Sequence, residues 1–322
     1  MRILLVGGAG FIGHNLALAL RTRGHEVAVF DSMAINHLHS PESKEPEYID
    51  FLLDRMTLLK ENGVIVTRGD ATSYHGLSRT AREFQPHAIV HLAAVAHANR
   101  ARKMRHETFD NNLKTLENVL DIAAQRDVFP DAPHVVYFSS SMVYGDFKLG
   151  QALESFECDP KTLYGGVKLA GENLIKGYRE LGVPYTIIRP SALYGPRCIS
   201  GRVIQKFIEA ARRGEPVRVQ ESSSLDFTYI NDLVDGVVLA LESDVRGETF
   251  NMTYGKARQL LEVLRILREH YPDLTWEKQP SEMEMPNRGT CVMAKAKNLL
   301  GHEPKWPLEK GIPAYVDWYE NR

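Results

Sequence analysis

The stretch R-I-L-L-V-G-G-A-G-F-I-G at residues 2–13 decides the fold of this chain. Residues 2–6 are a short apolar run that predicts a buried strand, and a helical apolar pattern begins at Phe11. Three glycines lie between the two, where a strand must turn sharply into a helix. A strand, a glycine-rich turn and a helix in this order predict the first unit of a parallel sheet with helices on its faces.

The alternation of strand and helix continues as far as residue 190. Further strands are predicted at residues 26–31, 64–67, 88–91, 135–139 and 185–189. Helices are predicted near residues 48–62, 73–85, 106–126 and 162–181. This order predicts an α/β protein with a doubly wound parallel sheet of the Rossmann type and right-handed crossovers.

The glycine-rich turn predicts a dinucleotide site. Gly7 allows the tight turn, Gly10 lets the backbone approach a pyrophosphate, and Gly13 lets the helix pack close to the strand. The helix N-terminus, which includes Phe11 and Ile12, adds its dipole and unpaired N–H groups for the phosphates. A glycine-rich turn that binds no cofactor is the alternative.

Two aspartates follow the second and third predicted strands. The carboxylate of Asp31 can accept both ribose hydroxyls and would repel a 2′-phosphate, which favours NAD over NADP; a turn or helix cap is the alternative. Asp70, followed by Ala71 in R-G-D-A, is placed to meet the adenine, or is an ordinary turn aspartate. The fourth strand ends in H-L-A-A, whose small residues suit a flat ligand. The cofactor-binding residues predicted in this run are Leu92, Ala93 and Ala94.

A tyrosine and a lysine four residues apart, Tyr164 and Lys168, predict the chemistry. If residues 162–181 are helical, the phenol and the ammonium share one face. A free tyrosine has a pKa near 10, so a base at neutral pH must lose roughly 3 units, or about 4 kcal/mol. A fixed ammonium and a positively charged nicotinamide ring could supply this. The pair therefore predicts proton movement coupled to hydride transfer; a surface tyrosine beside a solvated lysine is the alternative.

The fifth predicted strand ends in S-S-S-M-V-Y-G at residues 139–145. Hydroxyls at the carboxyl end of a parallel strand face the crevice where such sheets bind ligands. We expect one of them to donate to, or relay a proton from, a substrate hydroxyl held against Tyr164. The helix that carries Tyr164 is predicted to begin at Asp159-Pro160, with the aspartate as its N-cap.

Composition limits the class of protein. The 322 residues, 43% hydrophobic and 25% charged, can bury a large core. A net charge of −2 and a pI near 6.6 create no positive field for nucleic acid. Three widely separated cysteines predict a reducing cytoplasm and no structural zinc site, and we expect no metal. No apolar run approaches 18 residues and no cleavage site follows the N-terminus, so we expect neither a membrane span nor a signal peptide.

After Pro190 the alternation loosens. Short strands are predicted at residues 217–219 and 249–252, and helices at residues 203–213, 231–242 and 257–270. This predicts a smaller α/β lobe that binds the substrate. We assign residues 1–190 to the nucleotide-binding Rossmann domain, to which residues 227–254 return. Residues 191–226 and 255–322 form the substrate-binding lobe.

Together these motifs resemble the extended short-chain dehydrogenase/reductases, and more narrowly their NAD-dependent nucleotide-sugar epimerase/dehydratase branch. The resemblance runs from residue 2 to A-K-N-L-L-G-H-E-P in the tail. The matching segments, in order, are G-G-A-G-F-I-G, Asp31, H-L-A-A, S-S-S-M-V-Y-G, Y-G-G-V-K, R-P-S-A-L-Y-G-P-R and D-F-T-Y-I-N-D-L-V.

The resemblance implies NAD as cofactor and assigns the catalytic roles. Tyr164 would be the base, Lys168 would hold the nicotinamide ribose and tune the tyrosine, and Ser140 would be the catalytic hydroxyl. Asn112 opens the family's N-x-x-x-x-x-N and would shape the site. The remaining cofactor-binding residues expected here are Ser139 and Pro190. The helices at residues 106–126 and 162–181 would pair across a two-fold axis, which implies a homodimer.

The residues after Ser140 separate the subfamilies. Sugar 4,6-dehydratases place an Asp-Glu pair there, and UDP-glucuronate decarboxylases have a glutamate in this stretch, whereas this chain has Ser141 and Met142. Neither can do acid–base work, so the chain resembles the 4-epimerases. In these, Tyr164 takes the O4 proton while hydride passes from C4 to NAD. The 4-keto sugar then turns and receives the hydride on its opposite face.

Two departures from the family concern the substrate. Leu225 replaces an arginine that grips the diphosphate, and Ala192 stands where many members carry an asparagine. Another cation must substitute, or the leaving group differs. We expect Arg288 to contact the phosphate and Arg197 or Arg202 to reach the cleft. The substrate-binding residues expected on the sugar side are Ser140, Ser141, Met142 and His97, the last with Asn99 and Arg100 in what could also be an ordinary polar loop.

We interpret the chain as an NAD-dependent epimerase of a nucleotide-linked sugar, inverting C4. A dehydratase or a 4-keto reductase on the same site is the first alternative. A non-catalytic NAD-binding regulatory protein is the second, and the intact Tyr164, Lys168 and Ser140 argue against it. The sequence specifies neither the nucleotide nor the sugar.

Overall fold

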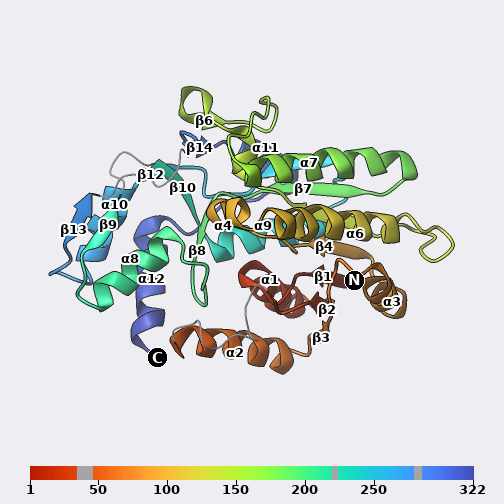
Figure 1. Cartoon of the computed structure of the whole chain (residues 1–322), viewed down its shortest axis with the longest axis horizontal. Helices are drawn as coiled ribbons and strands as arrows, with labels where there is room; N and C mark the ends of the chain where they lie inside the picture. The colour runs from red at the N-terminus through yellow and green to blue at the C-terminus, as the bar shows by residue number, and fades with distance from the viewer. Residues whose placement is uncertain (35–45, 220–223, 279–284) are drawn as a thin grey trace.

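The computed structural model of the protein describes residues 1–34, 46–219, 224–278 and 285–322. Its centre is a seven-stranded sheet in the order β11-β7-β5-β4-β1-β2-β3, and every neighbouring pair is parallel (Figure 1). The strands are β1 (Arg2–Val6), β2 (Glu26–Asp31), β3 (Ile65–Arg68), β4 (Ala88–His91), β5 (His134–Phe138), β7 (Tyr185–Arg189) and β11 (Glu248–Asn251). The predicted doubly wound Rossmann sheet is confirmed, and its strand order reverses between β1 and β4.

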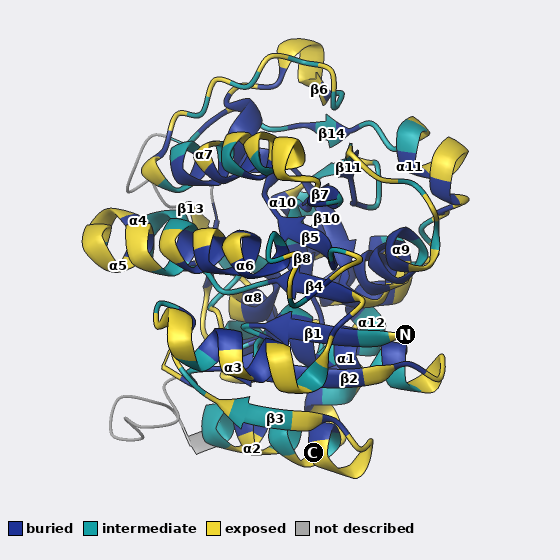
Figure 2. Cartoon of the chain, turned by 90° about the vertical axis from the view of Figure 1, so that its right-hand side faces the viewer, coloured by how far each residue is buried: buried dark blue, intermediate teal, exposed yellow. Residues whose placement is uncertain are grey.

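Helices cover both faces of this sheet, which is why its strands are continuous apolar runs (Figure 2). Successive side chains of β1 enter two different cores. Ile3 and Leu5 pack in the core formed with α1 (Phe11–Thr22), α2 (Pro46–Glu61) and α9 (Ile230–Glu242). Leu4 and Val6 pack in the core formed with α3 (Tyr74–Phe84), α6 (Thr115–Ala123) and α7 (Leu163–Gly177).

The helix predicted at residues 106–126 is present in the structure as a continuous helical run over residues 105–123. It begins with α5 (Arg105–Phe109), and the non-helical backbone of Met104 separates it from a short preceding helix, α4 (Ala98–Lys103). A π-helical turn, η2 (Asp110–Lys114), then leads into α6. The helix predicted at residues 162–181 ends as α7 at Gly177 and continues as the 3₁₀ turn η5 (Tyr178–Leu181).

Outside the large sheet and its covering helices, the described residues form short strands and four further helices, gathered mainly at the left of Figure 1. Its strand groups are β8 (Ala192–Tyr194), β10 (Ser224–Tyr229) and β12 (Ala257–Gln259); β9 (Val217–Val219) with β13 (Trp276–Lys278); and β6 (Gln151–Ala152) with β14 (Thr290–Cys291). The helices are α8 (Val203–Arg212), α10 (Leu260–Arg268), α11 (Ala294–Leu300) and α12 (Leu308–Glu320). Two 3₁₀ turns, η3 (Ser141–Tyr144) and η4 (Lys148–Gly150), precede β6.

The helix predicted to begin at residue 257 begins instead at Leu260, because residues 257–259 pair with β10 as strand β12. A capping box fixes this start, with the Glu262 carboxylate accepting from the backbone N–H of Gln259 at 2.7 Å. After β10, helix α9 leads back to β11 at the edge of the large sheet. The boundary predicted at residue 227 thus falls inside β10, and the division into lobes stays a prediction. Among the described residues, no helix has both the length and the apolar character needed to cross a membrane.

Candidate active site

The turn between β1 and α1 lies at the carboxyl edge of the sheet. Gly7 has a φ of +80°, and a Cβ there would lie 2.5 Å from the backbone nitrogen of Ala93, so this position requires glycine. Gly10 is the N-cap of α1, no side chain caps the helix, and a Cβ there would meet nothing within 3.4 Å. Gly13 packs against Gly8 of the turn itself, rather than against the strand. The N-terminus of α1 therefore offers unpaired N–H groups beside open space.

Asp31 ends β2 beside this turn. Its buried carboxylate accepts from the backbone N–H groups of Ala9 at 2.9 Å and Met33 at 2.8 Å. Burial raises the pKa of Asp31, and these two hydrogen bonds oppose the rise. The remaining lone pairs stay available to a ligand donor. Asp70, exposed after β3, accepts from the backbone N–H of Thr72 at 2.8 Å and so takes the turn role that its sequence also allowed.

The loop after β4 crosses the glycine turn. The N–H groups of Leu92 and Ala93 both donate to the carbonyl of Val6, at 2.8 and 2.9 Å. Asn112, in the π-helical turn, is fully buried and accepts from the N–H of Val95 at 2.8 Å. Its amide Nδ2 is buried and has no hydrogen-bond partner. Asn112 thus fixes the path of this loop and still carries one donor for a ligand.

Helix α7 begins after Thr162, whose hydroxyl accepts from the backbone N–H of Gly165 at 3.1 Å. The cap predicted at Asp159 is wrong, because that carboxylate instead accepts from the Lys161 ammonium at 2.7 Å. A Cβ on Gly165 would lie 2.5 Å from the carbonyl oxygen of Met142. The glycine therefore lets the start of α7 touch η3, which brings the neighbouring Tyr164 to Ser140 after β5.

Lys168 lies one turn further along α7 and is 3% exposed. Its ammonium donates to the carbonyl of Phe138 at 2.7 Å and lies 6.0 Å from the centroid of the Tyr164 ring. Burial lowers the pKa of Lys168 to about 7, and the Glu172 carboxylate opposes this. The predicted pairing of phenol and ammonium on one helix face is present in the structure.

The pKa of Tyr164 is raised by burial, and the charge of Arg202 and the Ser140 hydroxyl oppose the rise. The sequence led us to expect the Lys168 ammonium to lower this pKa. In the protein alone burial outweighs every opposing charge, because that ammonium points to the Phe138 carbonyl. The sequence analysis also named a second positive charge that could lower this pKa, that of a nicotinamide ring, and only a bound cofactor would bring it.

A buried ion pair supports this part of α7. Glu172 is fully buried and binds the Arg189 guanidinium through both oxygens, at 2.8 and 2.6 Å. The Ser139 hydroxyl also donates to Glu172, at 2.5 Å. The Ser139 hydroxyl therefore spends its proton on Glu172 of this ion pair and has none to donate to a ligand. The ends of β5 and β7 are tied to α7 through this cluster.

The residues after Ser140 form the 3₁₀ turn η3. The Ser140 hydroxyl caps the turn by accepting from the N–H of Met142 at 3.2 Å. The N–H of Ser141 donates to the carbonyl of Pro190 at 2.9 Å. Ser141 and Met142 are buried and carry no carboxylate to the site.

A cavity of about 1370 Å³ opens at this edge of the sheet. This exceeds the roughly 300–1,000 Å³ of ordinary small-molecule pockets, so it has room for two ligands together. The predicted site residues that line it are Ile12, Leu92, Ala94, His97, Ser139, Ser140, Ser141, Met142, Tyr164, Lys168, Pro190 and Arg288. The predicted cofactor residues outside its lining are Gly7, Gly10, Phe11, Gly13, Asp31, Asp70, Ala71, Ala93 and Asn112.

The structure separates the arginines that the sequence grouped together. Arg288 and Arg202 line the cavity, as does Leu225, whereas Arg197 is absent from its lining among the described residues. Arg197 has a φ of +62°, and this turn directs its guanidinium to within 6.0 Å of the Trp318 ring centroid. Of the two arginines in this loop that the sequence offered, Arg202 is the one that lines the cavity. Its place immediately before a predicted helix is the feature of the sequence that distinguishes it.

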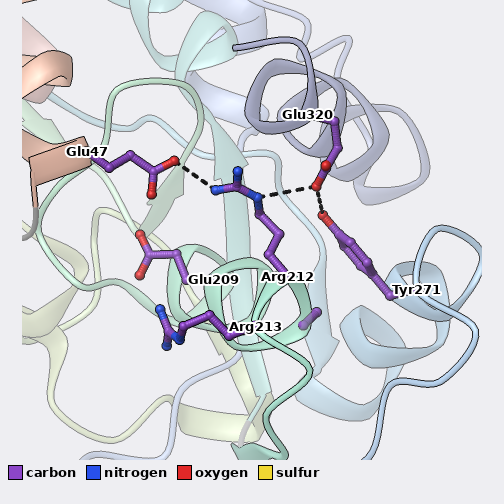
Figure 3. Close-up of a pocket in the computed structure, with 7 residues that line it drawn as sticks. Glu47, Glu209, Arg212, Arg213, Tyr271 and Glu320 are labelled. Atoms are coloured by element: carbon purple, nitrogen blue, oxygen red, sulfur yellow. Dashed lines mark hydrogen bonds and ion pairs between the residues drawn. The ribbon is translucent and has the colours of Figure 1, made fainter.

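A second cavity, of about 430 Å³, shares Glu209 and Arg213 with the first but is lined by none of the predicted site residues (Figure 3). Its central residue, Arg212, pairs with Glu47 at 2.8 Å and with Glu320 at 3.4 Å. Tyr271 donates to Glu320 at 2.6 Å. Because these groups satisfy one another, this cavity offers a ligand less than the larger one, which we take as the candidate active site.

The residues present fit NAD. The uncapped N-terminus of α1 and the space at Gly10 suit a pyrophosphate, and Asp31 suits ribose hydroxyls. Lys168 donates one of its three protons to a carbonyl and keeps two for a ligand. The buried, unpartnered Nδ2 of Asn112 lies in the same region.

Comparison with known proteins agrees with this geometry. The model of the NAD dependent epimerase/dehydratase family matches residues 3–253. The chain belongs to this family. It is similar to UDP-glucuronate 4-epimerase 1 of Arabidopsis thaliana, at 27% identity over 98% of this chain and 76% of that protein. It is also similar to dTDP-glucose 4,6-dehydratase of Xanthomonas campestris, at 28% identity over 98% of this chain and 92% of that protein.

Solved structures of extended short-chain dehydrogenase/reductases share the whole fold. UDP-glucuronic acid 4-epimerase from Bacillus cereus, in complex with UDP-glucuronic acid and NAD, superposes with a TM-score of 0.88 at 25% identity. UDP-glucose 4-epimerase from Thermotoga maritima, with UDP-glucose, superposes with a TM-score of 0.86 at 25% identity. Each match covers 100% of this chain and 99% of the other. This family is NAD-dependent, and the protein is accordingly an NAD-dependent enzyme of the family.

Proposed function

We propose that this protein is an NAD-dependent epimerase of a nucleotide-linked sugar and that it inverts C4. The observation that carries the proposal is the wall of the large cavity. It presents Tyr164, Ser140 and Lys168 together, while Ser141 and Met142 supply no carboxylate. A proton at a sugar hydroxyl can be handled there, but elimination of water lacks its acid and its base at these positions.

The residues divide the work as follows. The Tyr164 phenolate takes the proton of O4, and Ser140 orients that hydroxyl. The Lys168 ammonium lies beside them, held by the Phe138 carbonyl, and the Glu172 carboxylate favours its charged form. NAD, held by the turn after β1, Asp31 and Lys168, would supply hydride transfer from and back to C4, with return on the opposite face of the sugar. Tyr164 then returns its proton to O4, so the product has the mass of the substrate.

The similar proteins support this reading, since their names include UDP-glucuronate 4-epimerase and UDP-glucose 4-epimerase. They also include a dTDP-glucose 4,6-dehydratase, so the reaction must be tested directly. The purified protein is incubated with UDP-, dTDP-, GDP- and CDP-sugars without added cofactor, and products are identified by NMR and mass. C4 epimers of unchanged mass are expected. A keto product about 18 mass units lighter, which is the mass of water, would replace the proposal with a dehydratase.

We also propose that the protein is a homodimer of the cytoplasm. Helices α6 and α7 lie side by side on the outside of the molecule (Figures 1 and 2), and Leu163 at the start of α7 is 44% exposed. These helices would pair with their copies across a two-fold axis. The three free cysteines support a reducing compartment. Light scattering coupled to size exclusion measures the oligomeric state, and a monomer at micromolar concentration would refute the pairing.

We further propose the division into two functional parts. Residues 1–190, with the part of 227–254 that returns to the large sheet as α9 and β11, form the NAD-binding domain. Residues 191–226 and 255–322 form the substrate-binding lobe, which contributes Arg202 and Arg288 to the cavity.

A further inference from the structure

Tyr137 lies on β5, one residue before the carbonyl that binds Lys168, and it is fully buried. Its hydroxyl donates to the backbone carbonyl of Lys168 at 3.2 Å. The Lys168 ammonium lies over its ring, 5.1 Å from the centroid, whereas the centroid of the Tyr164 ring is 6.0 Å away. Tyr137 therefore contacts Lys168 twice, through its hydroxyl at the backbone and through its ring at the charge.

Helix α7 is shaped to receive this tyrosine. A Cβ on Gly171 would overlap the hydroxyl oxygen of Tyr137, so this position requires glycine. Glycine inside a helix is less favourable than alanine, and a buried hydroxyl is unfavourable unless it is hydrogen-bonded. The glycine lets the tyrosine ring lie directly against the helix turn that runs from Lys168 to Gly171.

Few other groups attract the Lys168 charge. The side chain is buried, and its ammonium donates to the Phe138 carbonyl. In the described part of the chain Glu172 is the charged group that acts on it, and both oxygens of that carboxylate already bind Arg189. A cation shielded from water is attracted to the face of an aromatic ring more strongly than an exposed one. The Tyr137 ring is therefore a main source of the attraction that holds this ammonium.

The remaining titratable groups around the ammonium are neutral at pH 7. The ring centroid of His91, at the end of β4, lies 5.8 Å from that of Tyr137. Burial and the Lys168 charge lower the pKa of His91 to about 3. Burial raises the pKa of both Tyr137 and Tyr164, so both phenols keep their protons in the protein alone. The elements α4, α5, η2 and η3 also pack against α7, and among the described residues they bring no charge that acts on the ammonium.

We propose that Tyr137 is a positioning residue of the active site: the face of its ring holds the Lys168 ammonium against the Phe138 carbonyl and beside Tyr164. This inference rests on the proposed function, because only in that reaction do the position and charge of Lys168 matter for Tyr164. The hydroxyl of Tyr137 fixes the ring by its bond to the Lys168 carbonyl, and the ring carries the effect. The ammonium loses its proton as pH rises through its pKa, so a weaker hold on the charge moves that loss to lower pH.

The pKa of Lys168, measured by NMR of lysine side chains in the full chain stripped of nucleotide, tests the proposal. Lys168→Met identifies the resonance. Tyr137→Leu, which removes the ring, should lower this pKa by about one pH unit, the range of a contact between a cation and a ring shielded from water. Tyr137→Phe keeps the ring and should leave the pKa within about 0.3 pH unit of the wild-type value. Fluorination of that phenyl ring withdraws electron density from its face with little change of shape, and should lower the pKa part of the way.

The matched control is Tyr185→Leu, which removes another buried tyrosine of the same core and should leave the pKa of Lys168 unchanged. An equal fall in this control would overturn the proposal and attribute the effect to a loosened core. An unchanged pKa in the fluorinated protein would also overturn it, and this variant decides the question if Tyr137→Leu does not fold.

Epimerisation by the holoenzyme is measured separately across pH. In Tyr137→Leu the alkaline limb of kcat/KM should move to lower pH together with the pKa of Lys168. A rate lowered equally at every pH would overturn the proposal, because it is what a tyrosine that only fills the core predicts. A shifted pKa without any C4 epimer from the wild type would refute the proposed reaction and leave the hold of Tyr137 on Lys168 standing.

Discussion

The buried ammonium of Lys168 leads to a prediction about stability. Burial lowers the pKa of Lys168 from its usual 10.5 to about 7, and the side chain is 3% exposed. At about 1.36 kcal/mol per unit, folding with this lysine at pH 7 costs about 4 kcal/mol. Lys168→Met removes that cost and loses about 1 kcal/mol with the hydrogen bond to Phe138. We therefore expect the variant to be more stable than the wild type at pH 7 by about 3 kcal/mol.

The pH dependence of this difference identifies its cause. Below pH 7 the lysine is protonated in both the folded and the unfolded chain, so its cost is constant. Between pH 7 and pH 10.5 the unfolded chain holds a proton that the folded chain has released, so wild-type stability rises relative to the variant. The advantage of Lys168→Met should shrink by about 2 kcal/mol between about pH 7 and about pH 9. Urea unfolding of both proteins, stripped of nucleotide, measures it.

Lys176→Met is the matched control for this series. Lys176 lies two turns further along α7, its side chain is 45% exposed, and its ammonium is 3.9 Å from Glu172. Its replacement should change stability by less than about 0.5 kcal/mol at every pH. A Lys168→Met protein that is less stable than the wild type by a constant amount across this pH range would refute the reasoning. Such a result would show that the contacts of the folded protein stabilise the ammonium by more than its burial costs.

Four further substitutions test other parts of the site. Tyr164→Phe should lower epimerisation, followed by NMR, by about 10²- to 10⁴-fold with an unchanged unfolding curve; near-normal turnover would remove the tyrosine from its role. Gly7→Ala should destabilise the fold by at least about 1–3 kcal/mol, since its Cβ would meet backbone at 2.5 Å. Gly10→Ala should instead fold normally and bind NAD more weakly by titration; the opposite order would contradict our reading of the turn. Glu172→Gln should lower the unfolding free energy by about 3–5 kcal/mol, because a buried arginine loses its counter-charge; a shift below about 1 kcal/mol would mean that the ion pair is solvated.

The sequence predicted the parts of this protein in which residue type and local spacing determine the geometry. The glycine turn, the doubly wound parallel sheet and the Tyr164–Lys168 face were all predictable in this way. The cap of α7 was not, since Asp159 and Thr162 are both good N-caps. The structure shows that Thr162 caps the helix and that Asp159 instead binds Lys161. The π-helical turn before α6 was not predicted either, because nothing in the residues of D-N-N-L-K at 110–114 requires it.

Which arginine reaches the cavity could not be predicted from the sequence. Arg197 and Arg202 lie five residues apart in one loop, and both seemed able to reach the cleft. A left-handed backbone at Arg197 sends that side chain to Trp318, and nothing in the residue type signals such a φ. Arg202 could have been recognised as unusual, because it stands where the periodicity of α8 requires a cap.

The raised pKa of Tyr164 also has a consequence for how the site works. Burial leaves this phenol protonated in the protein alone, and Arg202 is the strongest opposing charge. Lys168 and the bound NAD must provide the rest of the lowering of the pKa that the base requires. An active Arg202→Gln protein would therefore isolate their share, since its pH profile would report Tyr164 without the arginine.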